Sequence, residues 1–191
     1  MTRHSDSYRT PARLFHWMIA AAVLLMIPAG LIMTQDGISR PVQDALFLFH
    51  KNMGVILIPL ILLRLIYRLR HTAPPLPPSV PGWQRSAAAV SHWLLYVLLI
   101  VMPISGFVRV RAGGFPIEML HVLGVGSWLA KSEALANAAK GLHYAAALLL
   151  IAVLAVHICA ALQHGLIGRD GVWSRIWPPV RPRDEGEGPL G

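Results

Sequence analysis

Four long apolar stretches constrain this chain more than any other feature of its sequence. They run from Leu14 to Met33, from Ala45 to Leu69, from Ser86 to Val108 and from Gly141 to Leu166. A helix needs about 20 mostly apolar residues to cross the hydrocarbon core of a bilayer, and each stretch meets that length. Of the 191 residues, 55% are hydrophobic and only 14% are charged, which excludes an ordinary soluble domain. We therefore expect an all-α integral membrane protein, built as a four-helix bundle.

The segments between these stretches fit the same architecture. Residues 72–82 contain five prolines, which exclude a helix and predict an extended loop. The piece from Ile117 to Leu135 is only moderately apolar and carries charges such as Glu118, so we expect a short interfacial helix rather than a fifth span. Residues 1–177 are predicted to form the transmembrane domain. Residues 178–191, rich in Pro, Gly and acidic side chains, are predicted to be a disordered tail.

Lysine and arginine are distributed unequally between the two sides of the predicted bundle. Eleven of the 17 fall on the side that contains both termini and the proline-rich loop, and six fall on the opposite side. Loops rich in Lys and Arg remain in the cytoplasm, so we predict that both termini are cytoplasmic. The partner implied by this charge is the lipid bilayer. No nucleic-acid partner is predicted, because no basic run is interleaved with aromatic residues.

Five histidines lie within the predicted spans, namely His16, His50, His92, His143 and His157. Ionisable residues are costly in hydrocarbon and are usually functional there. His143 and His157 are 14 residues apart, which places them on nearly one face of a helix and about 21 Å apart along its axis. One ligand near each membrane surface suits two stacked cofactors, and haem iron held by two imidazoles is the natural candidate. Zinc is disfavoured, since no Cys, Asp or Glu ligand is predicted at the same depth.

Depth in the membrane restricts how these histidines can pair. The second stretch begins on the side where the fourth stretch also begins, so His50 lies at the level of His143. No other histidine within a span is predicted at that level, and His50 with His143 is therefore the firmest pair. At the opposite level, His157 can pair with His16 or with His92. The spacing alone leaves both possibilities open.

Two further residues are expected beside the haems. Gly54 lies one turn after His50, where the absence of a side chain would let a porphyrin approach the helix backbone. Arg64 lies 14 residues after His50, at the level of the other cofactor. Its guanidinium is suited to bind the propionates of that haem.

Taken together, these features resemble the bacterial cytochrome b561 family, small four-helix membrane cytochromes b that carry two haems. The resemblance covers residues 8–177. It rests on Arg13-Leu14-Phe15-His16-Trp17, His50 with Gly54, Arg64 to Arg68, the proline-rich loop, His92-Trp93-Leu94-Leu95-Tyr96, Pro103-Ile104-Ser105-Gly106, Gly141-Leu142-His143 and His157. The resemblance implies two haem b groups in the bacterial inner membrane. It assigns His16 and His157 to the cytoplasmic haem iron, and His50 and His143 to the periplasmic one.

The resemblance also implies two alternative functions. Some members of the family are stand-alone enzymes that take electrons from superoxide at the periplasmic face and pass them to ubiquinone. Others are the membrane cytochrome subunits that anchor a hydrogenase or a formate dehydrogenase and exchange electrons with quinone. The compact length of this chain favours the first function, a superoxide:ubiquinone oxidoreductase.

Candidate residues can be named for both substrates. Superoxide is an anion, so positive side chains at the periplasmic surface would attract it. Lys51, which follows a predicted haem ligand, and Arg109 and Arg111, which follow the third stretch, are the candidates. Ubiquinone takes up protons when it is reduced, so a protonatable residue near the membrane boundary is needed. His164 and His92 are the candidate quinone contacts.

Overall fold

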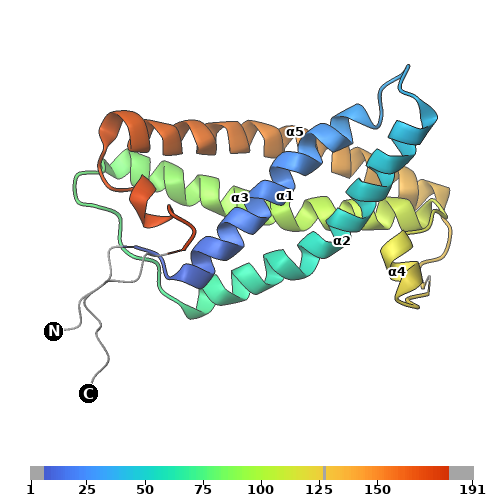
Figure 1. Ribbon diagram of the computed structural model, residues 1–191, viewed down its shortest axis with the longest axis horizontal. Coiled ribbons are helices and arrows are strands. Elements are labelled where there is room, and N and C mark those ends of the chain that lie inside the picture. The colour runs from blue at the N-terminus through green and yellow to red at the C-terminus, as the bar shows by residue number, and fades with distance from the viewer. Residues whose placement is uncertain (1–6, 127, 181–191) are drawn as a thin grey trace.

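The computed structural model describes residues 7–126 and 128–180; most of the predicted tail, residues 181–191, lies outside the described residues. Its long helices are α1 (Thr10–Ile32), α2 (Arg40–Arg70), α3 (Gly82–Ala112) and α5 (Glu133–Leu162) (Figure 1). All four are long and apolar enough to cross a membrane. A short helix, α4 (Glu118–Val122), lies between α3 and α5. The predictions of an all-α fold with four spans, and of a short helix between the third and the fourth, are confirmed.

The four long helices pack as two pairs. α1 packs against α2, α3 packs against α5, and contacts between α2 and α3 join the pairs. Figure 1 shows α3 and α5 side by side, with α1 and α2 running at an angle to them. The start of α1, the loop between α2 and α3, and the segment after α5 lie at one end of the bundle. The loop between α1 and α2 lies at the other end together with α4 (Figure 1).

Local sequence explains where these helices begin. Pro11 and Pro41 lie in the first turns of α1 and α2, where the missing N–H of proline would have no partner inside the helix. Ser132 caps α5, because its hydroxyl oxygen accepts a hydrogen bond from the backbone N–H of Leu135 at 3.3 Å. α5 thus begins at Glu133, ahead of the apolar stretch that starts at Gly141. The last residues of the piece from Ile117 to Leu135, which was expected to lie at the membrane surface, therefore belong to the first turn of α5.

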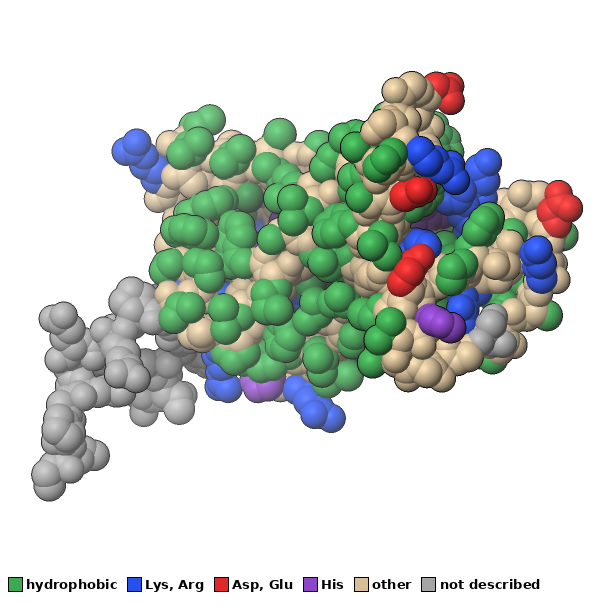
Figure 2. Space-filling view, turned by 45° about the vertical axis from the view of Figure 1, so that its right-hand side comes forward, with side chains coloured by type: hydrophobic (Ala, Val, Ile, Leu, Met, Phe, Trp, Pro, Cys, Tyr) green, Lys and Arg blue, Asp and Glu red, His purple; other side chains and the backbone are tan. Residues whose placement is uncertain are grey.

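A layer of buried apolar side chains holds the bundle together midway along its length. Every long helix contributes to it, and its members are Ile19, Val23, Leu57, Ile61, Leu98, Ala146 and Leu150. Large apolar side chains also cover the outside of the bundle, as Figure 2 shows, and this is the surface that lipid hydrocarbon requires. In the same view, charged side chains gather at the end of the bundle that carries α4.

The segment that follows α5 folds back over the start of α1. The buried guanidinium of Arg13 donates to the carbonyl oxygens of Pro178 at 2.9 Å and Ser174 at 3.2 Å. The indole Nε1 of Trp17 donates to the carbonyl oxygen of Ile176 at 3.0 Å. Backbone carbonyls of this segment are therefore hydrogen-bonded to Arg13 and Trp17 near the start of α1. Sequence hydropathy gave no indication of this contact.

Candidate functional site

The histidines predicted to bind haem form two pairs, one toward each end of the bundle. The ring centres of His50 on α2 and His143 on α5 are 6.3 Å apart. Those of His16 on α1 and His157 on α5 are 6.4 Å apart. The apolar core layer lies between the two levels. The structure therefore brings together both pairs that the family resemblance implies.

Both separations fit a metal ion held between two imidazoles. A bond from a metal to an imidazole nitrogen is about 2 Å long, and the ring centre lies roughly 1 Å behind that nitrogen, so two ligating rings have centres about 6 Å apart. Four imidazoles on apolar helices are also the donor set that haem iron accepts. The residues present thus fit one haem between two histidines at each level.

A third imidazole, that of His92, lies beside the pair at the level of His157. Its ring centre is 5.5 Å from that of His157, and the two rings meet edge to face. Proximity alone therefore does not decide between His16 and His92, since both adjoin His157. Both separations lie within about 0.5 Å of the value for two ligands sharing a metal, so the assignment of His16 remains a prediction that the family resemblance implies.

Two glycines allow histidine rings to pack against the neighbouring helix. A Cβ at Gly30 of α1 would lie 2.8 Å from Cε1 of His50, closer than real Cβ atoms approach other atoms. A Cβ at Gly106 of α3 would lie 3.1 Å from Cε1 of His143, which is also tight. At Gly54, the position named from the sequence, the nearest atom would be a methionine methyl at 3.8 Å, an ordinary contact. Space for a porphyrin at Gly54 remains a prediction.

Arg64 reaches the ring of His16. Its Nη2 lies 3.2 Å from Nδ1 of His16, and its Nη1 donates to the carbonyl oxygen of Ala12 at 3.3 Å. Arginine has donors only, so Nδ1 of His16 accepts in this arrangement and Nε2 carries the hydrogen of the neutral ring. Binding of a metal through Nε2 would require Arg64 to release the ring. The freed guanidinium would then be available for a propionate at this level, which remains the prediction for Arg64.

Lys51, the first of the predicted superoxide-attracting cations, is held by α4. Its Nζ lies 2.5 Å from Oε1 of Glu118 and donates to the carbonyl oxygen of Pro116 at 3.0 Å. Asn52 secures the same helix, because its Oδ1 accepts from the N–H of Met119 at 2.9 Å. Burial alone would raise the pKa of Glu118, but the hydrogen bonds from Lys51 and Asn52 and the charge of Lys51 act together with a backbone hydrogen bond to lower that pKa below its ordinary value. The charge of Lys51 is therefore largely compensated.

The two arginines that follow the third span differ from each other. Arg111 is buried and donates to the carbonyl oxygen of Gly126 at 2.9 Å, so it anchors the loop after α4. Arg109 lies within electrostatic reach of both His50 and His143. Within residues 7–126 and 128–180, the Arg109 side chain has no ion pair or hydrogen bond. Of the three cations named from the sequence, Arg109 is thus the one whose charge acts directly on the histidine pair.

At the other end of the molecule, His164 is held by a residue that sequence inspection missed. α5 continues into a π-helical turn, η1 (Gln163–Gly168), and Nδ1 of His164 lies 2.5 Å from Oδ2 of Asp170. The other carboxylate oxygen of Asp170 accepts from the N–H of Val172 at 3.1 Å. Burial alone would raise the pKa of Asp170, but the hydrogen bonds from His164 and Val172 lower it below its ordinary value. The seven-residue spacing of His157 and His164 gave no indication of this carboxylate.

Four apolar helices with facing histidines at two levels define a membrane cytochrome. Comparison with known proteins agrees with this class. The chain belongs to the prokaryotic cytochrome b561 family, whose model matches residues 7–179. It is a multi-pass membrane protein, and membership of the family implies haem b.

Three relatives illustrate the family. The chain is 30% identical over 179 residues to cytochrome b561 homolog 2 of Escherichia coli, covering 92% of this chain and 93% of the relative. It is 28% identical over 129 residues to cytochrome b561 homolog 1 of the same organism, covering 68% and 73%. It is 27% identical over 176 residues to a Yersinia pestis protein named probable superoxide oxidase CybB, covering 87% and 93%. Of these three names, that of the Yersinia protein specifies a substrate.

Proposed function

We propose that this protein is a dihaem cytochrome b that oxidises superoxide at the periplasmic face and reduces ubiquinone in the membrane. The proposal is carried by the two ring-centre separations of 6.3 and 6.4 Å at opposite ends of the bundle. His50 and His143 would hold the periplasmic haem b, and His16 and His157 the cytoplasmic one. When bound, haem b supplies one-electron redox chemistry at its iron. The name of the Yersinia relative supports superoxide as the electron donor.

The balance of this reaction assigns different tasks to the two ends of the molecule. Each of two superoxide anions loses one electron and leaves as dioxygen, while one ubiquinone gains two electrons and two protons. The periplasmic end therefore has to attract an anion, and the quinone site has to obtain protons. The excess of Lys and Arg on the side of the termini, eleven against six, supports placing the α4 end in the periplasm.

Attraction of superoxide is assigned chiefly to Arg109. Its positive charge has no compensating carboxylate among the described residues and acts on both His50 and His143. Lys51 contributes less, because Glu118 neutralises it, and Arg111 is occupied with the loop at Gly126. A small anion would consequently be drawn toward the histidine pair itself rather than toward α4.

Protonation of the quinone is assigned to the pair of His164 and Asp170. His164 donates from Nδ1 to the ionised carboxylate, which leaves Nε2 to exchange a proton with a quinone at the membrane boundary. Asp170 stabilises the positively charged imidazole that forms whenever His164 takes up a proton. His92, beside His157, is the second candidate quinone contact.

Stopped-flow mixing of the purified, oxidised, haem-loaded protein with superoxide tests the proposal. Prompt haem reduction is expected in the wild type. Arg109→Glu is expected to slow it by roughly tenfold or more, because it reverses the charge beside the histidine pair. Arg40→Glu is the matched control, since it makes the same change at an exposed residue of the same end that already pairs with Asp44. We expect Arg40→Glu to retain at least half the wild-type rate.

Two results would contradict the proposal. A protein that carries both haems but is inert toward superoxide is not a superoxide oxidase, and the alternative of a dehydrogenase-bound cytochrome subunit would then apply. Equal slowing by Arg109→Glu and Arg40→Glu would show that only total charge matters, which would remove the specific role of Arg109.

A further inference from the structure

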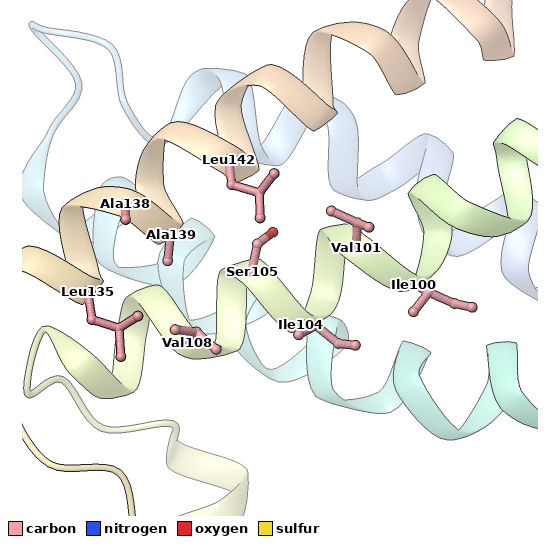
Figure 3. A pocket seen from close by; sticks show the side chains of 9 residues that line it. All are labelled: Ile100, Val101, Ile104, Ser105, Val108, Leu135, Ala138, Ala139 and Leu142. Atoms are coloured by element: carbon pink, nitrogen blue, oxygen red, sulfur yellow. The ribbon is translucent and has the colours of Figure 1, made fainter.

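Three polar groups meet on one side of the His143 ring. Nδ1 of His143 lies 3.0 Å from the carbonyl oxygen of Met102 and 3.1 Å from Oγ of Ser105. The Ser105 hydroxyl in turn lies 3.0 Å from the same Met102 oxygen. Ser105 is only 3% exposed, and Figure 3 shows its side chain on α3 pointing toward α5 near Leu142.

This triangle fixes the positions of two hydrogens. The Met102 carbonyl can only accept, so both the Ser105 hydroxyl and Nδ1 of His143 donate toward it. Nδ1 of His143 therefore carries the ring hydrogen, and Ser105 Oγ is a second acceptor for that hydrogen. Nε2 keeps its lone pair, which is the form in which an imidazole binds a metal.

The opposing ring of His50 is held differently. Its Nδ1 is buried and has no hydrogen-bond partner in the described part of the chain. The His50 ring occupies the space that a Cβ at Gly30 would need. Of the two histidines at this level, His143 is thus the one oriented by hydrogen bonds.

We propose that Ser105 is a positioning residue that, as a second acceptor beside the Met102 carbonyl, strengthens the hydrogen bonding of Nδ1 of His143 and thereby lowers the midpoint potential of the periplasmic haem. A hydrogen bond donated by the second nitrogen of a ligating histidine makes the ring a stronger electron donor to the metal. A stronger donor stabilises the oxidised iron more than the reduced iron. This inference rests on the proposed binding of haem between His50 and His143.

Redox titration of haem-loaded Ser105→Ala tests this role. At a fixed potential near the midpoint, the ratio of reduced to oxidised periplasmic haem is expected to rise roughly threefold to tenfold, the factor that corresponds to one net hydrogen bond. The cytoplasmic haem is expected to titrate as in the wild type. The electron paramagnetic resonance signal of the oxidised periplasmic haem is expected to shift, and a His50→Ala variant that keeps only the other haem identifies which signal is which.

Two variants separate positioning from packing. Ser105→Thr retains a hydroxyl that can reach a carbonyl one turn earlier on a helix, so it is expected to restore the wild-type titration. Ser91→Ala is the matched control, because it removes a buried hydroxyl of α3 that has no hydrogen-bond partner among the described residues. It is expected to leave the periplasmic haem unchanged.

The outcomes distinguish this inference from the function on which it rests. If Ser105→Ala carries both haems and titrates as the wild type does, Ser105 has no positioning role and the proposed function stands. If both haems shift equally, the serine acts through general packing and the inference is wrong. If the wild-type protein holds no haem at the periplasmic level, the proposed function itself fails.

Discussion

At the scale of single residues, the two levels of the bundle differ in how many imidazoles they contain. His50 and His143 face each other as a pair, whereas His157 has both His16 and His92 as neighbours. If His157 and one other histidine held a haem at this level, either His16 or His92 would not be needed as a ligand. The family resemblance assigns His16 as the ligand, and under that assignment His92 would be available to contact a quinone.

Replacement of the two competing histidines separates these roles. We expect His16→Ala to lose one of two haems, because no other side chain of α1 replaces the ligand. We expect His92→Ala to retain both, since the family resemblance assigns the ligand role at this level to His16 and His157. Haem-to-protein stoichiometry and reduced-minus-oxidised spectra of the two variants measure the difference. Loss of a haem from His92→Ala with both retained in His16→Ala would reverse the assignment.

At the scale of helices, close packing of α1 on α2 depends on a missing side chain. Gly30 meets the His50 ring at a point where even a methyl group would be too close. The same relation holds between α3 and α5 at Gly106 and His143, so each helix pair is built around one glycine and one imidazole. The His50 and His143 rings are thus each positioned by the helix that packs beside them as well as by their own.

Gly30→Ala is therefore expected to displace the His50 ring. The added methyl should destabilise the protein by about 1–3 kcal/mol, as overpacking of a filled site does, and lower haem occupancy at the level of His50. Chemical unfolding in detergent and haem content are the measurements. Gly141→Ala on α5 is the control, because a Cβ added there would have no neighbouring atom within 4 Å. This change should be neutral or slightly stabilising. Wild-type stability and haem content in Gly30→Ala would show that the helices separate freely at this point.

The sequence predicted the helices better than their ends and their contacts. Hydropathy located all four spans, but it missed the start of α5, because the polar side chains Glu133, Asn137 and Lys140 interrupt the apolar pattern before Gly141. Spacing along one helix gave the depth of each histidine. It could not show that Asp170 returns to His164 or that Ser105 faces His143, because such contacts depend on how separate elements pack.

At the scale of the whole molecule, the segment after α5 closes one end of the bundle. It is tied to α1 through Arg13 and Trp17, and Arg175 within it donates to the carbonyl oxygen of Pro75 in the proline-rich loop at 2.5 Å. Three distant parts of the chain thus converge where His164 and Asp170 lie. The proposed proton donor belongs to this assembly rather than to α5 alone.

Asp170→Asn tests that assembly in turnover. We expect ubiquinone reduction to slow by tenfold or more, because the neutral amide cannot stabilise a charged His164, while haem reduction by superoxide stays unchanged. The pKa of Asp170 lies below its ordinary value. The ionised carboxylate therefore contributes to folding stability at any pH above the ordinary pKa, and this contribution is lost as the pH falls through the lowered pKa. Stopped-flow traces with and without quinone measure the two steps. Asp36→Asn, in the exposed loop after α1, is the control, and equal quinone rates in all three proteins would exclude a role for Asp170.

The apolar layer between the two histidine levels has an electrical consequence. Its side chains, among them Leu57 and Leu98, are apolar and carry no group that can bind a proton. Electrons would cross this layer from haem to haem, while the protons for quinol would enter from the cytoplasm. Each catalytic cycle would then move negative charge inward without a compensating ion, so that scavenging of a toxic radical would help to energise the membrane.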